Sequence, residues 1–381
     1  MSLSDHHDAA DRPSRVLLVT TAAAPSGSLA GGRALFSHLT QQALLDILGP
    51  RLEIYRVPPQ RLRGWRALTS VFSGMIDGVN ASVVAEVVAT IQSKGISRVL
   101  VDGSGLGYLC KQLRLRAPHA EMFTVFHNCE ARFFLGALRH YKSLRSLGVL
   151  IANFNSERLA VRNSDRLICL NRRDSDLLLS LYGRGATDVS AIALRDRRIL
   201  SVDPSRTVTV GQYVLFVGGG FYANTAGIAW YARHVAPHVP VRTLVVGMGL
   251  ESMKTEIERF GNIEVVGAVD DLAPWYVGAS FVVAPIFDGS GMKTKVAEAL
   301  MFGKRVVGTA EAFTGYEEAL DRVGVSCRSP GEFIEAIKEE LRHANHAMRP
   351  ELRMIYERNY SLSAARTRWA RILGEGRIRH E

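Results

Sequence analysis

Short runs of β-branched and aliphatic residues alternate with helical patterns along this chain, and this alternation limits its fold more than any other feature. The runs are RVLLVTT, RLEIYRVP, SRVLVDG, EMFTVFH and DRLICLN in the first half, and QYVLFVGGG, VRTLVVG, NIEVVG, SFVVAPI and KRVVGT in the second. Continuous apolar runs of this length are typical of strands that are buried on both faces. Since strands that alternate with helices form parallel βαβ units, the sequence predicts an α/β fold with helices on both faces of its sheets.

A polar, charged stretch between Arg195 and Gly211 interrupts the alternation, which then begins again. A chain of 381 residues is also long for a single hydrophobic core. We therefore predict two doubly wound domains joined by this linker. Ligands of such open sheets bind outside the carboxyl ends of the strands, so two facing edges would form a binding cleft.

Composition narrows the class of protein and of partner. The hydrophobic fraction of 47% and the charged fraction of 22% are those of a globular protein. A net charge of +10 and a pI of about 9.6 favour anionic partners, namely phosphates, nucleic acid or a membrane surface. The polar N-terminus resembles no secretory signal, and no apolar run has the roughly 18 residues of a spanning helix. The four scattered cysteines form no CxxC, which predicts free buried thiols in a reducing, intracellular compartment.

The stretch DGSGMKTKVAEALMFGKRVVGT, residues 288–309, combines a glycine-rich loop, a helix and a strand. The loop follows a predicted strand, and Gly289 and Gly291 let its backbone amides turn inward without a Cβ in the way. We expect the helix to begin near Met292, so that its unpaired amides and the positive end of its dipole face the same spot. The sequence therefore predicts an anion site at this position.

Two lysines and a glutamate extend this predicted site. Lys293 and Lys295 would add formal charge for a phosphate, and Glu298 lies one to two turns further along, where it can accept hydrogen bonds from sugar hydroxyls. Together they indicate a nucleoside diphosphate with its ribose. The alternative is a solvated, lysine-rich helix after an ordinary tight turn.

Longer segments of the chain resemble a known family. Residues 263–309 resemble the donor-binding half of the GT-B glycosyltransferases, in particular the large family 4, and residues 215–239 are similar to the opening of its C-terminal domain. NYSLSAARTRWARILGE resembles the closing helix of that fold. In the first half the resemblance is thinner and rests on GSLAGGR, VFHNCEARF and DRLICLNRRDSDLLLSLYG.

The resemblance implies the GT-B fold, with two Rossmann-like domains that face each other across a cleft. The implied division is an acceptor-binding domain at 1–200, a nucleotide-sugar-binding domain at 201–360, and a helix at 361–381 that packs back on the first domain. The implied activity is transfer of a hexosyl unit from a UDP- or GDP-sugar to a saccharide or lipid-linked saccharide, with retention. Neither a metal nor a further cofactor is expected, and the implied role is assembly of a surface or exported polysaccharide.

The resemblance also assigns residues. Glu298 matches the carboxylate that holds the donor ribose, and His127 matches a histidine near the anomeric carbon. Lys293 or Lys295 would contact the diphosphate together with the amides of residues 290–292. The remaining residues expected at the donor are Gly31 and Gly32 in the loop that closes over the phosphates, and Gly219, Val269, Asp288, Ser290, Gly291 and Met292.

The chain departs from the family pattern in three places. Many relatives carry an acid eight residues before the ribose glutamate, where this chain has Ser290. GGGFYAN stands where relatives often have an arginine and a lysine, and AIALRDR replaces a familiar asparagine-glycine turn. An inactive GT-B-like scaffold, or a nucleotide-binding partner subunit, is therefore the alternative to an active enzyme.

Three smaller signals have ordinary structural explanations beside a functional one. VDGSGLGY lacks the third glycine of a dinucleotide fingerprint and predicts a turn at a strand end. DSD, from Asp174 to Asp176, begins a helical pattern, where an acid is expected to act as an N-cap instead of a metal ligand. His127 is followed by Asn128 and Glu130 at a strand end, which favours a ligand site over a buried structural histidine.

Residues 132–147 place apolar side chains at helical spacing from Phe133 to Leu144, with Arg132, Arg139, Lys142 and Arg145 between them. Such a helix can lie on an anionic bilayer, which would suit a lipid-linked acceptor and a peripheral position on the inner face of the cytoplasmic membrane. The alternative is a helix that packs on its own sheet and exposes a basic face.

Two other classes of protein fit the sequence less well. A nucleic-acid-binding protein would account for the charge, but no recognition motif appears. A two-domain dehydrogenase would account for the alternating strands and helices, but the glycine fingerprint is missing.

Overall fold

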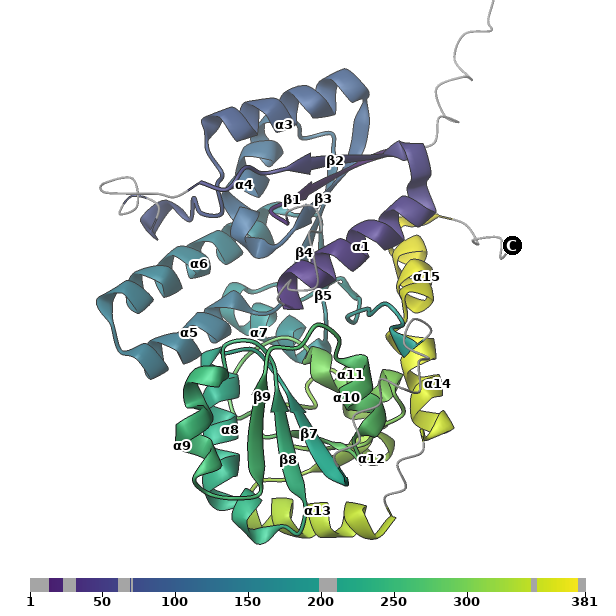
Figure 1. Cartoon of the computed structure of the whole chain (residues 1–381). Coiled ribbons are helices and arrows are strands. Elements are labelled where there is room, and N and C mark those ends of the chain that lie inside the picture. The colour runs from purple at the N-terminus through teal and green to yellow at the C-terminus, as the bar shows by residue number, and fades with distance from the viewer. Residues whose placement is uncertain are drawn as a thin grey trace, which may run out of the picture.

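The computed structural model describes residues 14–22, 32–60, 69, 71–198, 211–343 and 348–375. It contains two six-stranded sheets, in which every pairing is parallel (Figure 1). The prediction of two doubly wound units is confirmed. The boundaries at residues 200 and 360 stay a prediction, because most of the linker expected between Arg195 and Gly211 lies outside the described residues.

The first sheet has the strand order β2-β1-β3-β4-β5-β6. Its strands are β1 Arg15–Thr20, β2 Leu52–Arg56, β3 Ile96–Asp102, β4 Glu121–Phe126, β5 Arg166–Cys169 and β6 Asp188–Val189. The helices of this half are α1 Gly32–Leu48, α3 Ala81–Lys94, α4 Gly107–Arg116, α5 Glu130–Tyr141, α6 Leu144–Asn163 and α7 Arg172–Tyr182. Val16–Val19 of β1 are almost completely buried, as expected for a parallel strand that is covered on both faces.

The second sheet has the order β12-β11-β10-β7-β8-β9. Its strands are β7 Tyr213–Val217, β8 Arg242–Val246, β9 Ile263–Gly267, β10 Val282–Ala284, β11 Val306–Gly308 and β12 Gly324–Ser326. The helices of this half are α8 Tyr222–His234, α9 Lys254–Glu258, α10 Ala273–Gly278, α11 Thr294–Met301, α12 Leu320–Val323 and α13 Pro330–His343. All four cysteines of the chain are buried free thiols, as predicted.

The last two helices connect the second half to the first (Figure 1). α14, Pro350–Asn359, packs against α11, and α15, Leu362–Leu373, packs against α1. Arg366 of α15 donates to Asp46 of α1 at 2.7 Å, and Arg166 of β5 donates to the carbonyl of Ile372 at 2.6 Å. The closing helix therefore packs back on the first half of the chain, as predicted.

Two helix boundaries differ from the prediction. The pattern expected to form one helix over residues 132–147 is broken at Lys142, which has a left-handed backbone with φ of 47°. Ser143 then caps the next helix by accepting a hydrogen bond from the amide of Ser146 at 3.1 Å. The result is the α5–α6 hairpin. Periodicity alone missed this break because the apolar spacing continues across it.

The second difference concerns α7. An acid of DSD was expected as the N-cap, but Asp174 and Asp176 both lie within the helix. The cap is Asn171, which accepts a hydrogen bond from the amide of Asp174 at 2.8 Å. Asp174 is completely buried and accepts a second bond from the side-chain amide of Asn171 at 2.9 Å. Asn and Asp compete equally well for N-cap positions, so residue type could not decide between them.

Candidate functional site

A cleft of about 620 Å³ lies between the two halves of the chain, at the carboxyl ends of both sheets. Its wall on the first half comes from α1 and from the start of α5; its wall on the second half comes from the loops after β7, β8 and β9 and from α11. Lining residues of the first half include Arg33, Leu35, Asn128, Glu130, Phe133 and Phe134; those of the second include Gly219, Phe221, Asn224, Val269, Thr294, Lys295 and Glu298. Parallel sheets bind ligands at this edge, so the cleft is the candidate site.

The loop after β10 adopts backbone conformations that glycine favours. Gly289 has φ of 132° and Gly291 φ of 65°. A Cβ on Gly291 would lie 2.8 Å from the backbone oxygen of His127, so only glycine lets the loop approach the first half this closely. Helix α11 begins at Thr294, two residues later than expected, with Lys293 at the N-cap position.

Lys293 is held by a carboxylate that the sequence did not single out. Its Nζ donates to Glu311 at 2.8 Å and to the carbonyls of Gly291 at 3.0 Å and Ser290 at 3.3 Å. Arg173 and Arg132 from the first half also donate to Glu311, at 2.6 and 3.2 Å. Three cations thus converge on one carboxylate. Burial acts to raise the pKa of Glu311, but Lys293 and Arg173 outweigh it and hold this pKa below its ordinary value.

Lys295 faces the cleft from α11. It is buried, its Nζ donates to the side-chain oxygen of Asn224 at 2.8 Å, and it lies 4.4 Å above the ring of Phe216. Burial lowers the pKa of Lys295 to about 7, and the nearby charge of Lys293 acts in the same direction. An anion in the cleft would therefore meet a lysine that can gain a full charge when the anion binds.

Glu298 lies one turn further along α11 and also lines the cleft. Its Oε2 accepts a hydrogen bond from the hydroxyl of Tyr276 at 2.9 Å, and the ring of Tyr276 stacks on Phe302. The carboxylate is therefore held in one orientation by a buried tyrosine from α10. Its free acceptor capacity can bind the hydroxyls of a ligand in the cleft.

His127 follows β4 and is bound to a buried acid. Its Nε2 lies 2.7 Å from Oδ1 of Asp102, and Oδ2 of the same carboxylate accepts from the hydroxyl of Thr20 at 2.6 Å. Burial disfavours the charged form of Asp102, but the imidazole and the hydroxyl outweigh it and hold the pKa of Asp102 below its ordinary value. The carboxylate therefore accepts and Nε2 donates. Nδ1 of His127 has no hydrogen-bond partner among the described residues.

The side chains of Ser290 and Asp288 form hydrogen bonds with other groups of the protein. The hydroxyl of Ser290 accepts from the backbone amide of Cys129 at 3.1 Å and lies 3.5 Å from Oδ1 of Asp174. Oδ1 of Asp288 accepts from its neighbouring amide, that of Gly289, at 2.7 Å, and Oδ2 lies 3.4 Å from the hydroxyl of Tyr222. These contacts join the loop to the first half of the chain and to α8, and neither residue is among those that line the cleft.

The other residues that the sequence assigned to the donor site lie in different places. Gly219 and Val269 line the cleft beside Lys295 and Glu298. Met292 packs against Gly315, and Gly32 is the first residue of α1. Gly31 lies outside the described residues.

Glu130 is a further carboxylate on the first wall of the cleft, beside Arg33. Burial raises the pKa of Glu130 to about 7; Arg33 lowers it and Glu157 raises it. Glu157 itself accepts from the amides of Glu130 and Ala131 at the start of α5, at 2.8 and 3.1 Å. Asn128 and Glu130 could be suspected from the sequence because they follow a strand, whereas Phe221, Asn224 and Tyr276 carried no local signal.

Comparisons with known proteins agree with this architecture. Residues 211–343 match the family model described as "Glycosyl transferases group 1". No curated protein sequence matches the chain. Among solved structures, HepE of Anabaena in complex with UDP-glucose is similar over 94% of this chain and 99% of its own, with a TM-score of 0.65 and 15% identity.

Two further structures show the same fold. Sucrose-phosphate synthase of Thermosynechococcus elongatus covers 95% of this chain and 99% of its own, with a TM-score of 0.67 and 14% identity. WaaG, a glycosyltransferase involved in lipopolysaccharide biosynthesis, covers 92% and 94%, with a TM-score of 0.57 and 15% identity. By sequence, residues 211–343 thus resemble the group 1 glycosyltransferases, and the whole chain has the GT-B fold of two Rossmann-like domains that face each other across a cleft.

Proposed function

We propose that the protein transfers a hexosyl unit from a UDP- or GDP-sugar to a saccharide or lipid-linked saccharide acceptor. The observation that carries the proposal is the cleft between the two domains, where Lys295 and Glu298 face Glu130 and Arg33 across a space of about 620 Å³. The complex of HepE with UDP-glucose supports a nucleotide-sugar donor. The part that WaaG has in lipopolysaccharide biosynthesis supports a surface or exported polysaccharide as the product.

The donor would bind to the second domain. Glu298 would accept hydrogen bonds from the ribose hydroxyls, and Lys295, with the amides of Ser290, Gly291 and Met292, would hold the diphosphate. Lys293 forms an ion pair with Glu311. It would contact a phosphate of the donor by replacing the carboxylate of Glu311 with that phosphate. Gly219 and Val269 would contact the donor from the loops after β7 and β9. In this proposal the charge of the phosphates is balanced by lysines and amides without a metal.

The reaction would retain the configuration of the sugar. The bond between the anomeric carbon and the phosphate oxygen breaks, and the electron pair stays on the phosphate, where the lysines and amides stabilise it. The acceptor hydroxyl adds to the same face of the carbon and gives its proton to the leaving phosphate. His127, held by Asp102, would orient hydroxyl groups around the cationic ring.

Thermal unfolding with UDP, GDP, ADP and their sugars tests the donor site. A ligand that binds only the folded protein stabilises it by about 2.7 kcal/mol at a hundredfold excess over Kd, and this stabilisation raises the melting temperature. We expect one UDP- or GDP-sugar to raise it most. If none of these ligands shifts the transition, the nucleotide-sugar proposal fails. A product with an inverted anomeric centre would rule out the retaining mechanism.

The pKa of Lys295 predicts a pH dependence of donor binding. A diphosphate favours the charged lysine, so it raises the pKa of Lys295 from about 7 when it binds. Affinity for a nucleotide sugar should be full below pH 7 and should fall above it, by at most about tenfold per pH unit. Titration calorimetry between pH 6 and 9 measures this slope.

Two variants identify the group responsible for this slope. In Lys295→Met the slope above pH 7 should vanish. Glu130→Gln controls for the other cleft group that titrates near pH 7 and should leave the slope in place. A slope that survives in Lys295→Met would contradict the assignment.

An inactive scaffold or nucleotide-binding partner subunit is the second candidate, and one observation favours it. Ser290 replaces the acid of many relatives, and its hydroxyl accepts from the amide of Cys129 instead of facing the cleft. This alternative predicts nucleotide-sugar binding without transfer to any acceptor. The slow hydrolysis of a bound donor, measured as release of free sugar, would separate an enzyme from a scaffold.

We further propose that residues 132–147 bring the protein to an anionic membrane from the cytoplasmic side. Tyr141 and Leu144 are 60% and 88% exposed at the tip of the α5–α6 hairpin. Arg139, Lys142 and Arg145 surround them and are also exposed. No helix in the described ranges is long and apolar enough to cross a bilayer. Such a tip can insert shallowly while its basic residues meet lipid phosphates.

A further inference from the structure

Glu130 is a buried acid whose carboxylate has no partner within the described part of the protein. The residue is 8% exposed and lines the cleft from the first turn of α5. Among the described residues, no side chain or backbone group forms a hydrogen bond or an ion pair with this carboxylate. Every other buried acid of those residues accepts at least one hydrogen bond, namely Asp102, Glu157, Asp174, Glu298 and Glu340. Because an unpaired buried carboxylate is costly, its position on the cleft wall indicates a ligand that supplies the missing donors.

The fold leaves this carboxylate free because other groups take the roles that it could fill. Glu157 of α6 accepts hydrogen bonds from the amides of Glu130 and Ala131, so the start of α5 is capped by a different helix. Arg33, the cation beside Glu130 on the same wall, donates to Asp77 at 3.1 Å instead. Glu130 is therefore available to a molecule in the cleft.

A second acceptor without a donor lies two residues earlier. Oδ1 of Asn128 is buried and has no hydrogen-bond partner among the described residues, and Asn128 also lines the cleft. A Cβ on Gly291 would lie 3.3 Å from Cβ of Asn128, so Asn128 stands beside the loop that we propose holds the donor phosphates. Two oxygen acceptors require two donors, and neighbouring hydroxyls of a sugar provide them.

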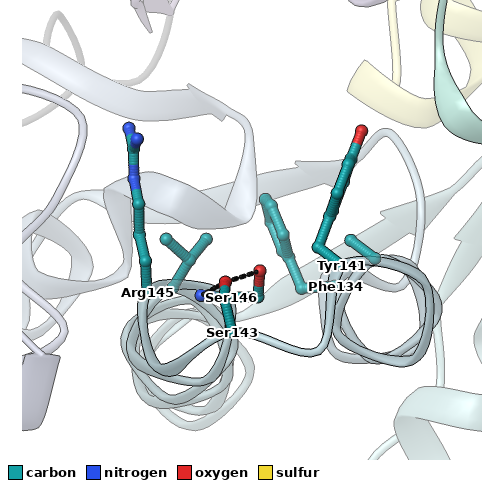
Figure 2. A pocket seen from close by; sticks show the side chains of 7 residues that line it. Phe134, Tyr141, Ser143, Arg145 and Ser146 are labelled. Atoms are coloured by element: carbon teal, nitrogen blue, oxygen red, sulfur yellow. Dashed lines mark hydrogen bonds between the residues drawn. The ribbon is translucent and has the colours of Figure 1, made fainter.

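Aromatic rings continue the same face of α5. Phe133 and Phe134 follow Glu130 by three and four positions, so the three side chains share one helix face, and all of them line the cleft. The two rings meet edge to face, with centroids 5.1 Å apart. Phe134 also lines a groove of about 480 Å³ between α5 and α6, where Figure 2 shows it beside Tyr141, so this ring separates the cleft wall from the groove. Acceptor oxygens beside apolar rings suit a sugar, which has hydroxyl groups at its edge and C–H groups on its faces.

We propose that Glu130 and Asn128 determine the acceptor specificity of the cleft by accepting hydrogen bonds from two neighbouring hydroxyls of a neutral sugar. The C–H face of this sugar packs on Phe133 and Phe134. An acidic sugar fits the wall poorly, because its carboxylate would face that of Glu130 while Arg33 is held by Asp77. The assignment of this sugar to the acceptor rests on the proposed function, but the sugar site itself does not.

Ligand-observed NMR titration in the presence of saturating UDP tests the site. The probes are the methyl α-glycosides of glucose, galactose and mannose, the deoxy analogues of the one that binds most tightly, and methyl glucuronide. Loss of either of two neighbouring hydroxyls should weaken binding roughly tenfold or more, because a buried acceptor then has no donor. Methyl glucuronide should bind more weakly than methyl glucoside. If no hexoside binds, if all deoxy analogues bind equally well, or if the glucuronide binds more tightly, the proposal is overturned.

Glu130→Gln identifies the carboxylate. The variant should bind the hexoside roughly tenfold or more weakly, and loss of the matching hydroxyl should then have no further effect, because both changes remove the same hydrogen bond. Glu351→Gln, at an exposed position in the first turn of α14, is the matched control and should bind like the wild type. Unchanged hexoside binding in Glu130→Gln overturns the proposal.

The melting temperature separates a ligand site from a structural role. Since the carboxylate of Glu130 has no partner to lose, Glu130→Gln without sugar should melt at the same temperature as the wild type or above it. A lower melting temperature would indicate a structural carboxylate and would overturn the proposal. If the variant does not fold, Asn128→Ala tests the same site and should weaken hexoside binding about threefold to tenfold.

These outcomes also separate the sugar site from the proposed function. If hexosides bind through Glu130 and no nucleotide sugar binds, the sugar site stands and the proposed function fails. If a nucleotide sugar binds and Glu130→Gln leaves hexoside binding unchanged, the function stands and the sugar site fails. In an active enzyme, Glu130→Gln should raise the KM of the acceptor and leave the Kd of the nucleotide sugar unchanged. If the variant instead binds the nucleotide sugar more weakly and the free nucleotide as before, Glu130 contacts the transferred sugar and the acceptor assignment is overturned.

Discussion

His127→Ala is expected to lower kcat by about 100- to 1000-fold while the affinity for the nucleotide sugar stays close to that of the wild type. Removal of one preorganised polar group at a reacting centre typically has an effect of this size. His127 belongs to the first domain, whereas the residues proposed to hold the nucleotide belong to the second. The substitution should therefore lower the turnover number and leave the affinity for the nucleotide sugar nearly unchanged. Initial rates with saturating donor, together with calorimetric Kd values, measure both.

The pair of His127 and Asp102 offers a control for this prediction. Asp102→Asn keeps the shape of the side chain but removes the charge that faces Nε2 at 2.7 Å. Asp102 would act as a positioning residue, so its variant should lower kcat by a smaller factor than His127→Ala and should leave the Kd of the nucleotide sugar unchanged, because the imidazole loses the carboxylate that orients it. Normal turnover in His127→Ala would remove the histidine from the mechanism.

Glu298→Gln is expected to weaken the binding of the donor nucleotide by about 10- to 100-fold. Hydrogen bonds to a charged group contribute about 1.5–3 kcal/mol each, and a difference of about 1.4 kcal/mol is a factor of ten. The amide keeps the size of the side chain but loses the charge and one acceptor. Calorimetric Kd values for the nucleotide sugar and for the free nucleoside diphosphate measure the loss.

Tyr276→Phe is the matched control for Glu298. It removes only the hydroxyl that donates to Oε2 at 2.9 Å and keeps the ring that stacks on Phe302. The carboxylate then remains but loses its orientation, so donor binding should weaken less than in Glu298→Gln. An unchanged Kd for the nucleotide in Glu298→Gln would refute the assignment of this carboxylate to the ribose.

Much of the second domain could be predicted because its signals are local. A strand such as Tyr213–Val217 appears as a continuous apolar run, and Gly289 and Gly291 mark a loop whose backbone requires glycine. Two short strands escaped prediction, β6 with two residues and β12 with three. β10 and β11 also have three residues each, but they lie within the longer apolar runs SFVVAPI and KRVVGT, which marked them as strands. The pairing of β6 and β12 is decided by the strands beside them in the sheet.

The contacts of the site escaped prediction for a different reason. Glu311 meets Lys293, which is near in the chain, but it also meets Arg173, which is 138 positions away. A contact between residues so far apart in the chain leaves no local pattern in the sequence from which it could be predicted. Likewise, the residue types of Asn171 and Asp174 could not show which of them caps α7, and the apolar spacing over residues 132–147 could not show the left-handed turn at Lys142.

By itself, the sequence determined the α/β class, the two sheets and the glycine-lysine loop that precedes Glu298, because each follows from local preferences of backbone and side chain. Only the tertiary structure decided that Lys293 is neutralised by Glu311, that Lys295 is buried against Asn224, and that a groove opens between α5 and α6 beside the cleft. Burial and charge pairing depend on which surfaces meet when the two domains pack, and that arrangement is a property of the folded chain.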